Sequence, residues 1–370
     1  MVSLGLFIIT SYVYYKITSF ETGENDSLLE FYTYQNNIAD VSKYLKAGVL
    51  EQIIINDLII KLENGSIIIQ RRYEMKRTAI IVDSGCDPSP VFIEKYKLNF
   101  MGMKIVIDEK DYTDGEDIKK DDFYKIITKA KEFHTAHPSV GYVVKKYEDI
   151  VAQKYDEIID IHFSSKMSGL INTCLLAKNM VPAANVKIID TESVSIESFL
   201  IAEKVVELIR EKGWSYEQVM EVLPEIKASA FMQFNVTTLN YLVKNGRIGK
   251  AAGLAGTLLN IKPILGVNDG YIAPIDKVRG MSKVYSVIVE NAINFLKDRP
   301  YNSKVFITYG GENNIEHMKE TYNLFLEKQK EINLPSHRLI ESRISPTIIC
   351  HSGPEVFGFA VYGEKEPIGL

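Results

Sequence analysis

The sequence has few cysteines and no excess of positive charge, and each shortage excludes a class of protein. The three cysteines, Cys86, Cys174 and Cys350, are far apart, so the chain has neither a local CxxC zinc motif nor a disulfide framework. With so few cysteines we expect the reducing environment of the cytoplasm. The formal net charge is −5, which indicates no nucleic-acid partner.

Several catalytic and cofactor motifs are also missing. The chain has no Walker loop and no G-x-G-x-x-G after an expected strand, so we predict no nucleotide cofactor bound by those motifs. It has no convincing pair of catalytic carboxylates and no G-x-S-x-G turn. Hydroxyls, arginines and a histidine remain, in a chain that is 46% hydrophobic. That inventory suits the binding of an amphiphile with an anionic head better than acid–base catalysis.

The first 77 residues differ in pattern from the rest, and we interpret 1–77 as an N-terminal extension. An apolar run at 4–15 lacks the preceding positive charge and the cleavage site of a signal peptide. It is shorter than the roughly 20 residues of a membrane span, although a transient membrane contact is an open alternative. Strand-like pieces at Ile53–Ile55 and Ser66–Ile69, around a turn at 63–66, predict a hairpin.

From Thr78 onward, strands, polar turns and helices alternate. Three buried strands are predicted at Thr78–Val82, Asp156–Phe163 and Val186–Asp190. Each is followed by a polar turn, and helices are predicted at 121–133, 171–179 and 195–212. This alternation is typical of a parallel sheet, with ligands bound at the carboxyl ends of the strands.

The last third repeats the α/β pattern. A helix begins near 215, a second helix is expected over 314–330, and strands are expected at Lys304–Tyr309, Arg338–Arg343 and Val356–Tyr362. We therefore predict an α/β fold class with two domains after the extension, at 78–229 and 230–370. A cleft between them is the natural ligand site.

Serine side chains gather after the second predicted strand, at Ser164, Ser165 and Ser168. Hydroxyls and free amides where a strand passes into a helix favour an anion such as a carboxylate or phosphate. The alternative is that one serine only caps the helix, since serine is a preferred N-cap.

A second polar segment runs from Phe133 to Ser139. Thr135 supplies a hydroxyl, and His134 and His137, with His162 as a third candidate, raise the question of a metal. Because no carboxylate or cysteine stands at a companion spacing, we predict no metal site.

A third segment contains His351, which can exchange a proton within a polar network. Paired with Ser168 it would make the protein a serine-dependent hydrolase or acyltransferase. The missing nucleophile turn and the absence of an obvious third member count against that alternative.

Two arginines complete the candidate groups. Arg247 follows the turn at 244–246, where Asn and Gly tolerate a positive φ. The glycines and alanines that follow predict a smooth helix at 249–259, suited to close packing or to the wall of a ligand tunnel. Arg279 follows a hairpin turn at 268–270 and can meet an anion or an acidic partner surface.

Taken together, these segments resemble the DegV family of bacterial fatty-acid-binding proteins, from about Thr78 to Glu364. Seven short motifs in family order carry the resemblance. They are Val-Asp-Ser-Gly-Cys-Asp at 82–87, His-Thr-Ala-His-Pro-Ser at 134–139, Ser-Ser-Lys-Met-Ser-Gly at 164–169, Tyr-Leu-Val-Lys-Asn-Gly-Arg-Ile at 241–248, Asn-Ile-Lys-Pro-Ile-Leu at 260–265, Lys-Val-Arg-Gly at 277–280 and His-Ser-Gly-Pro at 351–354.

The resemblance implies two α/β domains that enclose one fatty acid in a tunnel, in a carrier that is not itself an enzyme. The carboxylate would meet the hydroxyls of Thr135 and Ser168, with Ser164 and Ser165 nearby. The same resemblance assigns His351 and Arg247 to the fatty-acid site.

It also implies a partner. Family members that serve fatty acid kinase present the bound acid to a separate ATP-binding subunit, which phosphorylates the carboxylate for phospholipid synthesis. Arg279 would then belong to the face offered to that subunit.

Three positions depart from the family pattern. Ala136 stands where the loop normally has a second hydroxyl, His137 replaces a glutamine, and Asn245 replaces a glycine. We therefore expect fewer hydroxyls around the carboxylate, or the recruitment of His137. Residues 1–77 have no counterpart in the family.

Overall fold

The structure is a computed structural model that describes residues 52–55, 58–63 and 66–71, and residues 77–369 except 128, 255–260, 332, 333 and 335. The chain divides into two compact units, Met1–Met75 and Lys76–Leu370.

The first unit contains a three-stranded antiparallel sheet of β1 (Gln52–Ile55), β2 (Leu58–Glu63) and β3 (Ser66–Arg71). Strands β2 and β3 form a hairpin in which Glu63 pairs with Ser66, which confirms the predicted turn. Strand β1 pairs with β2, so the predicted hairpin is part of a larger sheet. The apolar run at 4–15 lies outside the described residues.

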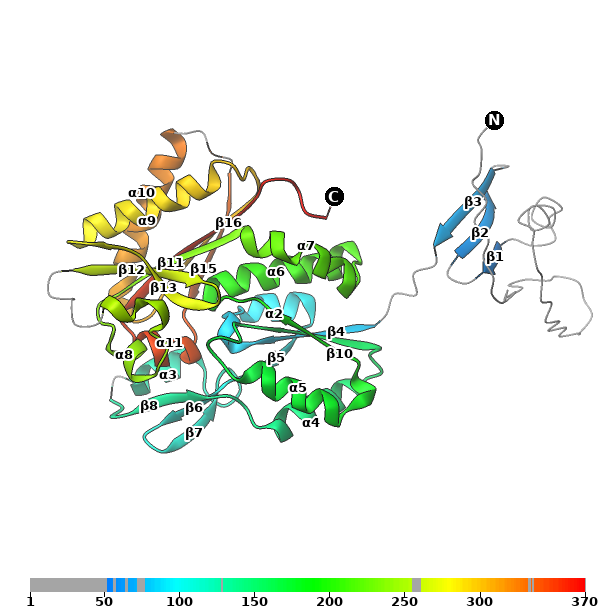
Figure 1. Cartoon of the computed structure of the whole chain (residues 1–370), viewed down its shortest axis with the longest axis horizontal. Coiled ribbons are helices and arrows are strands. Elements are labelled where there is room, and N and C mark those ends of the chain that lie inside the picture. Colours follow the sequence, from blue (N-terminus) through cyan, green and yellow to red (C-terminus); the bar gives the residue numbers. More distant parts are fainter. Residues whose placement is uncertain are drawn as a thin grey trace, which may run out of the picture. The chain divides into compact units, whose positions relative to one another are not determined.

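The second unit begins with a parallel sheet of strand order β10-β9-β4-β5 (Figure 1). Its strands are β4 (Thr78–Asp83), β5 (Asn99–Met101), β9 (Glu157–His162) and β10 (Val186–Asp190). Every residue of β4 and β9 is buried. β4 accordingly appears in the sequence as a nearly continuous apolar run, whereas β9 also buries the polar side chains of Glu157, Asp160 and His162. The predicted strand–turn–helix order is confirmed after β9 and β10, whereas β4 is followed by a helix at Pro90–Tyr96 that was not predicted.

Helices connect and cover these strands. They are α2 (Pro90–Tyr96), α4 (Val140–Ala152), α5 (Leu170–Met180), α6 (Ser195–Lys212) and α7 (Tyr216–Ala228), with short 3-10 turns η1 (Ser84–Cys86) and η2 (Pro182–Ala184). Helices α4 and α5 pack together on one side of the sheet, whereas α6 and α7 lie toward the second large sheet and contact β11 (Figure 1).

A small antiparallel sheet was not predicted. It has the order β7-β6-β8, and its strands are β6 (Lys104–Ile107), β7 (Lys110–Thr113) and β8 (Phe133–Ala136). The helix expected over 121–133 is shorter, because α3 spans Lys120–Ile127 and the chain then enters β8. The backbone of β8 pairs with β6, with Thr135 opposite Ile105. Because Ile105 is far from Thr135 in the sequence, a pattern of neighbouring residues could not reveal this strand.

The second large sheet has six strands in the order β13-β12-β11-β16-β14-β15. They are β11 (Ala230–Val236), β12 (Lys262–Asn268), β13 (Tyr271–Val278), β14 (Tyr301–Tyr309), β15 (Arg338–Arg343) and β16 (Val356–Glu364). Helices α9 (Met281–Leu296) and α10 (Ile315–Glu331) cover one face (Figure 1). The remaining elements are α8 (Asn240–Lys244), α11 (Pro346–Ser352), η3 (Gly249–Leu254) and η4 (Glu312–Asn314).

Two expectations are corrected in this half. The smooth helix expected at 249–259 is a 3-10 helix over Gly249–Leu254 in its described part. One reason is that Gly249 has φ +53 and lies against the backbone of Ile272, where an added Cβ would come within 2.5 Å of an oxygen. None of Gly249–Leu254 lines the cavity described below. The second correction is α11, a helix that contains His351 and was not predicted.

The predicted boundary at 229/230 separates the strands of the two large sheets, since β10 ends at Asp190 and β11 begins at Ala230. Buried side chains from both halves nevertheless form one continuous core, which includes Ile80 and Tyr362. The domain division therefore stays a prediction. Among the described residues, no helix is long and apolar enough to cross a bilayer.

Candidate functional site

A cavity of about 150 Å³ lies where the two large sheets and the small sheet meet. Its walls come from β8, from the loop at 167–169, from α8 and α11, and from β11, β13, β14 and β16. Apolar side chains predominate, including Met103, Phe163, Met232, Phe234 and Ile348. The cavity therefore offers an apolar environment inside the Lys76–Leu370 unit.

The hydroxyls along the apolar part of the cavity are bonded to the protein. Thr308 donates to a backbone oxygen at 2.7 Å, Ser195 donates to the Asp87 carboxylate at 2.7 Å, and Ser352 donates to a backbone oxygen at 3.2 Å. Thr347 donates to the carboxylate of Asp114. Because these hydroxyl protons are already donated to protein acceptors, a polar ligand group would gain few hydrogen bonds in this part of the cavity.

One end of the cavity differs, because polar groups with unused capacity gather there. The Thr135 hydroxyl lies 2.8 Å from Nε2 of His351, although the two residues come from β8 and α11. The other ring nitrogen of His351, Nδ1, is buried without a hydrogen-bond partner. Burial, with a smaller effect from the nearby Arg247 charge, lowers the pKa of His351 to about 4. The ring is therefore neutral at pH 7, so one ring nitrogen carries a proton and the other can accept one.

Arg247 supplies the positive charge at this end. Its Nε donates to the Met167 carbonyl at 3.1 Å and its Nη1 to the Asn245 carbonyl at 2.6 Å. These bonds aim the guanidinium but use only part of its five donors. Among the described residues, no carboxylate forms an ion pair with Arg247 in the structure, so a ligand anion would meet an uncompensated cation.

Ser168 lies at the same end of the cavity, directly before α5. Its oxygen accepts a hydrogen bond from the Leu170 amide at 3.2 Å, but the N-cap position of α5 is Gly169 and carries no side-chain cap. The hydroxyl proton stays available to a ligand. Ala136 and His137 line the same region, and the His137 ring lies 3.1 Å from the Thr173 hydroxyl.

Four of the residues predicted for an anionic head group thus meet at one end of the cavity. They are Thr135, Ser168, Arg247 and His351. Ser168 and His351, the pair that the hydrolase alternative needs, line this cavity but are not hydrogen-bonded to each other. Nε2 of His351 bonds to Thr135, and its Nδ1 has no carboxylate partner.

The other two predicted serines lie elsewhere. Ser164 is fully buried and donates to the Gly270 carbonyl at 2.8 Å, where it ties the loop to the turn between β12 and β13. Ser165 is exposed, and its amide points to Asp190 at 3.3 Å. Neither residue lines the cavity, so the structure does not bring these two predicted residues together with Thr135 and His351. Arg279 is exposed beyond the end of β13.

The chain matches a known protein family over most of its length. The model of a family described as uncharacterised protein, DegV family, matches residues 77–364. The chain belongs to the DegV family. The predicted family is confirmed, and residues before 77 lie outside the match.

Known DegV proteins are similar over nearly their whole length. A DegV domain-containing protein of Clostridium acetobutylicum is 30% identical over 293 residues, which cover 78% of this chain and 100% of that protein. A fat acid (stearic acid)-binding protein from Eubacterium ventriosum has a TM-score of 0.67 at 28% identity, covering 78% and 98% of the two chains. A DegV lipid binding protein from Thermotoga maritima has a TM-score of 0.68 at 27% identity, covering 78% and 100%. The predicted α/β fold of the DegV type is confirmed.

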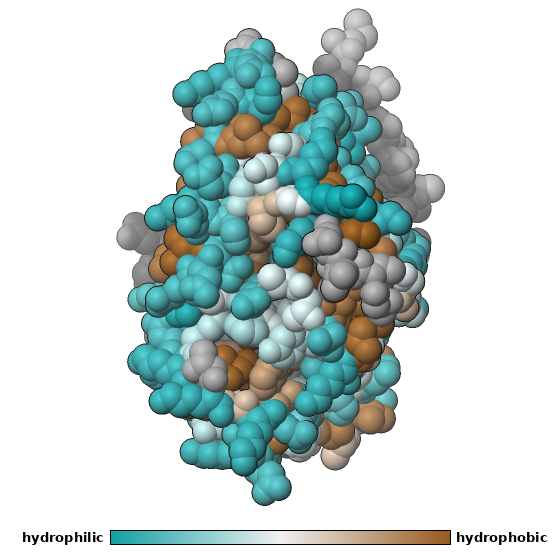
Figure 2. Space-filling model, turned by 90° about the vertical axis from the view of Figure 1, so that its left-hand side faces the viewer, coloured by the Kyte–Doolittle hydropathy of each residue, from teal (hydrophilic) through white to brown (hydrophobic). Residues whose placement is uncertain are grey.

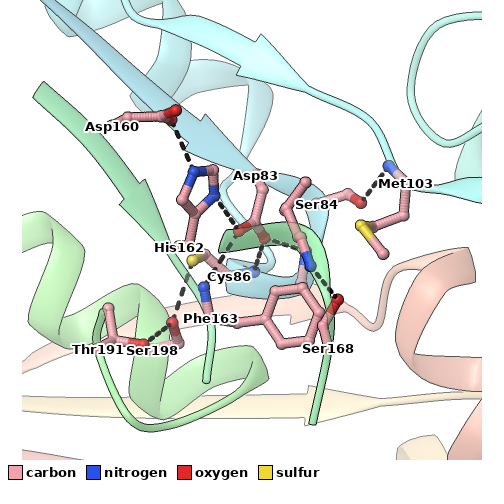
Figure 3. Close-up of polar contacts among 12 residues, drawn as sticks. Asp83, Ser84, Cys86, Met103, Asp160, His162, Phe163, Ser168, Thr191 and Ser198 are labelled. Atoms are coloured by element: carbon pink, nitrogen blue, oxygen red, sulfur yellow. Dashed lines mark hydrogen bonds and ion pairs between the residues drawn. The ribbon is translucent and has the colours of Figure 1, made fainter. Parts of the chain in front are cut away.

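Sequence reasoning missed a buried polar network in this DegV protein, beneath the loop at 163–169 (Figure 3). Asp83, at the end of β4, accepts hydrogen bonds from the amides of Gly85 and Phe163 and lies 2.9 Å from Nδ1 of His162. Asp160 and His162 are two residues apart on one strand and therefore share a face. Two polar residues at that spacing, each beside an isoleucine in a buried strand, are the sequence signal that was overlooked.

The surface of this DegV protein gives context for the cavity. Figure 2 shows the face that is on the left of Figure 1, and apolar residues form separate small areas there among hydrophilic ones. The cavity itself lies inside the protein, among buried apolar side chains.

Proposed function

We propose that this DegV protein binds a long-chain fatty acid in the cavity and has no catalytic activity of its own. The observation that supports the proposal is the contrast between an apolar interior, whose hydroxyls are turned away, and one end with an unpaired guanidinium and a free imidazole nitrogen. Similar proteins named for fatty-acid binding include a Thermotoga maritima protein at 27% identity and a TM-score of 0.64.

The chemistry of a fatty acid matches both parts of the site. Burial of an acyl chain contributes about 0.8 kcal/mol per CH₂, so a long chain supplies most of the affinity. The carboxylate must not be buried unpaired, and Arg247, Thr135, Ser168 and His351 line one end of the cavity together. Ala136 offers no hydroxyl there, so we assign the remaining bonds to these four side chains.

Native mass spectrometry of gently purified full-length protein, followed by extraction of the bound lipid, is the direct test. We expect one fatty acid per chain, and its length and unsaturation identify the preferred ligand. A protein that is empty and also refuses added fatty acids would contradict the proposal.

Substitution of Ser168 by alanine tests the head-group site. The change removes one hydroxyl donor and should weaken fatty-acid binding, whereas Ser165→Ala is the matched control because Ser165 is exposed and outside the cavity. Equal affinities in both variants would remove Ser168 from the site.

We further propose that the bound acid is presented to the separate ATP-binding subunit of a fatty acid kinase, for acyl-phosphate formation and phospholipid synthesis. Arg279 is exposed and belongs to the face offered to that subunit. Arg279→Ala should therefore impair phosphorylation by the kinase subunit while leaving fatty-acid affinity unchanged. Normal phosphorylation by the variant would contradict its role.

The second candidate function is a lipid hydrolase or acyltransferase that uses Ser168 and His351. Both residues line one cavity, which is the observation in its favour. A serine-reactive phosphonate distinguishes the two, because an enzyme would be labelled at Ser168 and a carrier would not.

A further inference from the structure

Three side chains with metal-binding chemistry meet in the interior, on the far side of the loop that contains Ser168. Asp160 and His162 belong to β9, and Cys174 belongs to α5. One oxygen, one nitrogen and the sulfur of these residues all lie within 4.8 Å of one another. All three side chains are fully buried, and none of them lines the fatty-acid cavity.

Two atoms of this group are left without hydrogen bonds. Nε2 of His162 and Oδ1 of Asp160 are buried and lie 3.0 Å apart as an ion-pair contact with each other, but neither makes a hydrogen bond of good geometry. Buried polar atoms are rarely left this way, and a missing ion is one of the explanations for such an exception.

The remaining side-chain atoms, Nδ1 of His162 and Oδ2 of Asp160, make contacts of the kind that orient metal ligands. Nδ1 of His162 lies 2.9 Å from the Asp83 carboxylate, and Oδ2 of Asp160 accepts a hydrogen bond from the Tyr147 hydroxyl at 2.6 Å (Figure 3 shows the contacts of Asp83, His162 and Asp160). A carboxylate behind a ligating histidine fixes its ring and tautomer, and ligating carboxylates are themselves hydrogen-bonded. Each of these two residues therefore keeps one atom without a hydrogen bond, in a cluster that also includes Cys174.

We propose that Asp160, His162 and Cys174 bind a zinc ion. Nitrogen and thiolate sulfur favour zinc over magnesium or calcium, which prefer oxygen alone. Zinc bond lengths of 2.0–2.3 Å place neighbouring ligands about 3.3–3.7 Å apart in a tetrahedron, so only small shifts are needed here. Three protein ligands leave the fourth position to a water molecule.

The ion would join two elements across the loop at 163–169, because β9 precedes the loop and α5 follows it. Its predicted effect is on the stability of this half of the protein, since a metal that binds only the folded chain stabilises it. The inference does not depend on what the cavity binds.

The test uses full-length protein without an affinity tag, produced in zinc-supplemented medium so that the ion is present during folding. Elemental analysis should find about one zinc per chain in the wild type. Cys174→Ala should lose it or bind at least tenfold more weakly. Cys350→Ala is the matched control, because Cys350 is also fully buried but lies in α11, and it should keep the zinc.

Cobalt provides a second readout that reports on the sulfur directly. Protein produced with Co²⁺ should show a thiolate-to-cobalt absorption band in the wild type and in Cys350→Ala, but not in Cys174→Ala. Asp160→Asn, which nearly preserves size, should also weaken metal retention. The proposal is overturned if the wild type contains no zinc, or if zinc is retained equally in Cys174→Ala. A wild type without zinc would mean that His162 is an imidazolium between the carboxylates of Asp83 and Asp160. Equal zinc retention in Cys174→Ala would mean that the ion is bound by other histidines.

Discussion

Arg247→Gln provides the sharpest test of the head-group assignment. The side chain of Arg247 is partly buried, and it meets no carboxylate among the described residues. A carboxylate about 4 Å from a guanidinium gains about 4 kcal/mol at an effective dielectric constant near 20 and about 1 kcal/mol in water. Because Arg247 is partly exposed, we expect about 2 kcal/mol, or roughly a thirtyfold loss of fatty-acid affinity in the variant.

The loss alone would not separate a direct role from a structural one, because Arg247 also bonds to the Met167 and Asn245 carbonyls. The assay is therefore titration of both proteins with a fatty acid and with its methyl ester, which has the same tail and no charge. If Arg247 meets the carboxylate, the wild type prefers the acid, and Arg247→Gln loses about thirtyfold of that preference while ester binding changes little.

The ratio of acid affinity to ester affinity decides whether Arg247 contacts the carboxylate. If the acid-to-ester ratio is the same in the wild type and in Arg247→Gln, the arginine acts only through the two carbonyls that it bonds. The comparison cancels any general weakening of the fold, since that weakening affects both ligands. Raising the salt concentration should reduce the wild-type preference for the acid and leave ester binding unchanged.

Three further predictions concern binding and stability. Thr135→Val removes a hydroxyl bonded to an imidazole and should weaken fatty-acid binding by about 1 kcal/mol in calorimetric titration; unchanged affinity would exclude this hydroxyl from the site. Burial raises the pKa of Glu197 to about 7, so its folded-state pKa lies above its unfolded value and stability is lost as the pH rises from about 4.5 to 7. Denaturant unfolding should show the wild type losing about 3 kcal/mol relative to Glu197→Gln across that window, and a constant difference would contradict the argument. Lys304→Met leaves the buried Glu203 carboxylate, 2.8 Å away, with the Arg338 guanidinium as its remaining cationic partner and should lower the free energy of unfolding by about 2 kcal/mol. The exposed Lys328→Met is its control, with an expected change below about 0.5 kcal/mol, and equal effects of the two would refute the reasoning.

The buried strands were predictable because burial on both faces leaves a pattern within a few residues. β4 and β9 are buried at every position, so the apolar residues at 79–82 and at 158, 159 and 161 marked their places, and the polar turns marked their ends. β8 and α11 were missed for the opposite reason. β8 has only four residues, and α11 is a seven-residue helix next to a proline, so neither is long enough to show a reliable period.

The head-group site was partly predictable, through the resemblance to a family and not through local pattern. The Thr135 hydroxyl and the His351 ring are 216 positions apart in the chain yet bonded to each other, and no spacing rule connects them. The three serines after β9 show the same limit. Their number suggested an anion site, but only Ser168 lines the cavity, while Ser164 turns to Gly270 and Ser165 to solvent.

The sequence by itself determined the alternating elements of the second unit, the turns that end its strands and the motifs of the DegV family, because these depend on neighbouring residues. The tertiary structure decided which side chains share a space. It placed Thr135, Arg247 and His351 at one end of an apolar cavity, and it gathered Asp160, His162 and Cys174 in the interior. The reason is physical: a hydroxyl, a charge or a thiol acts through atoms within a few ångströms, and the fold alone determines which atoms those are.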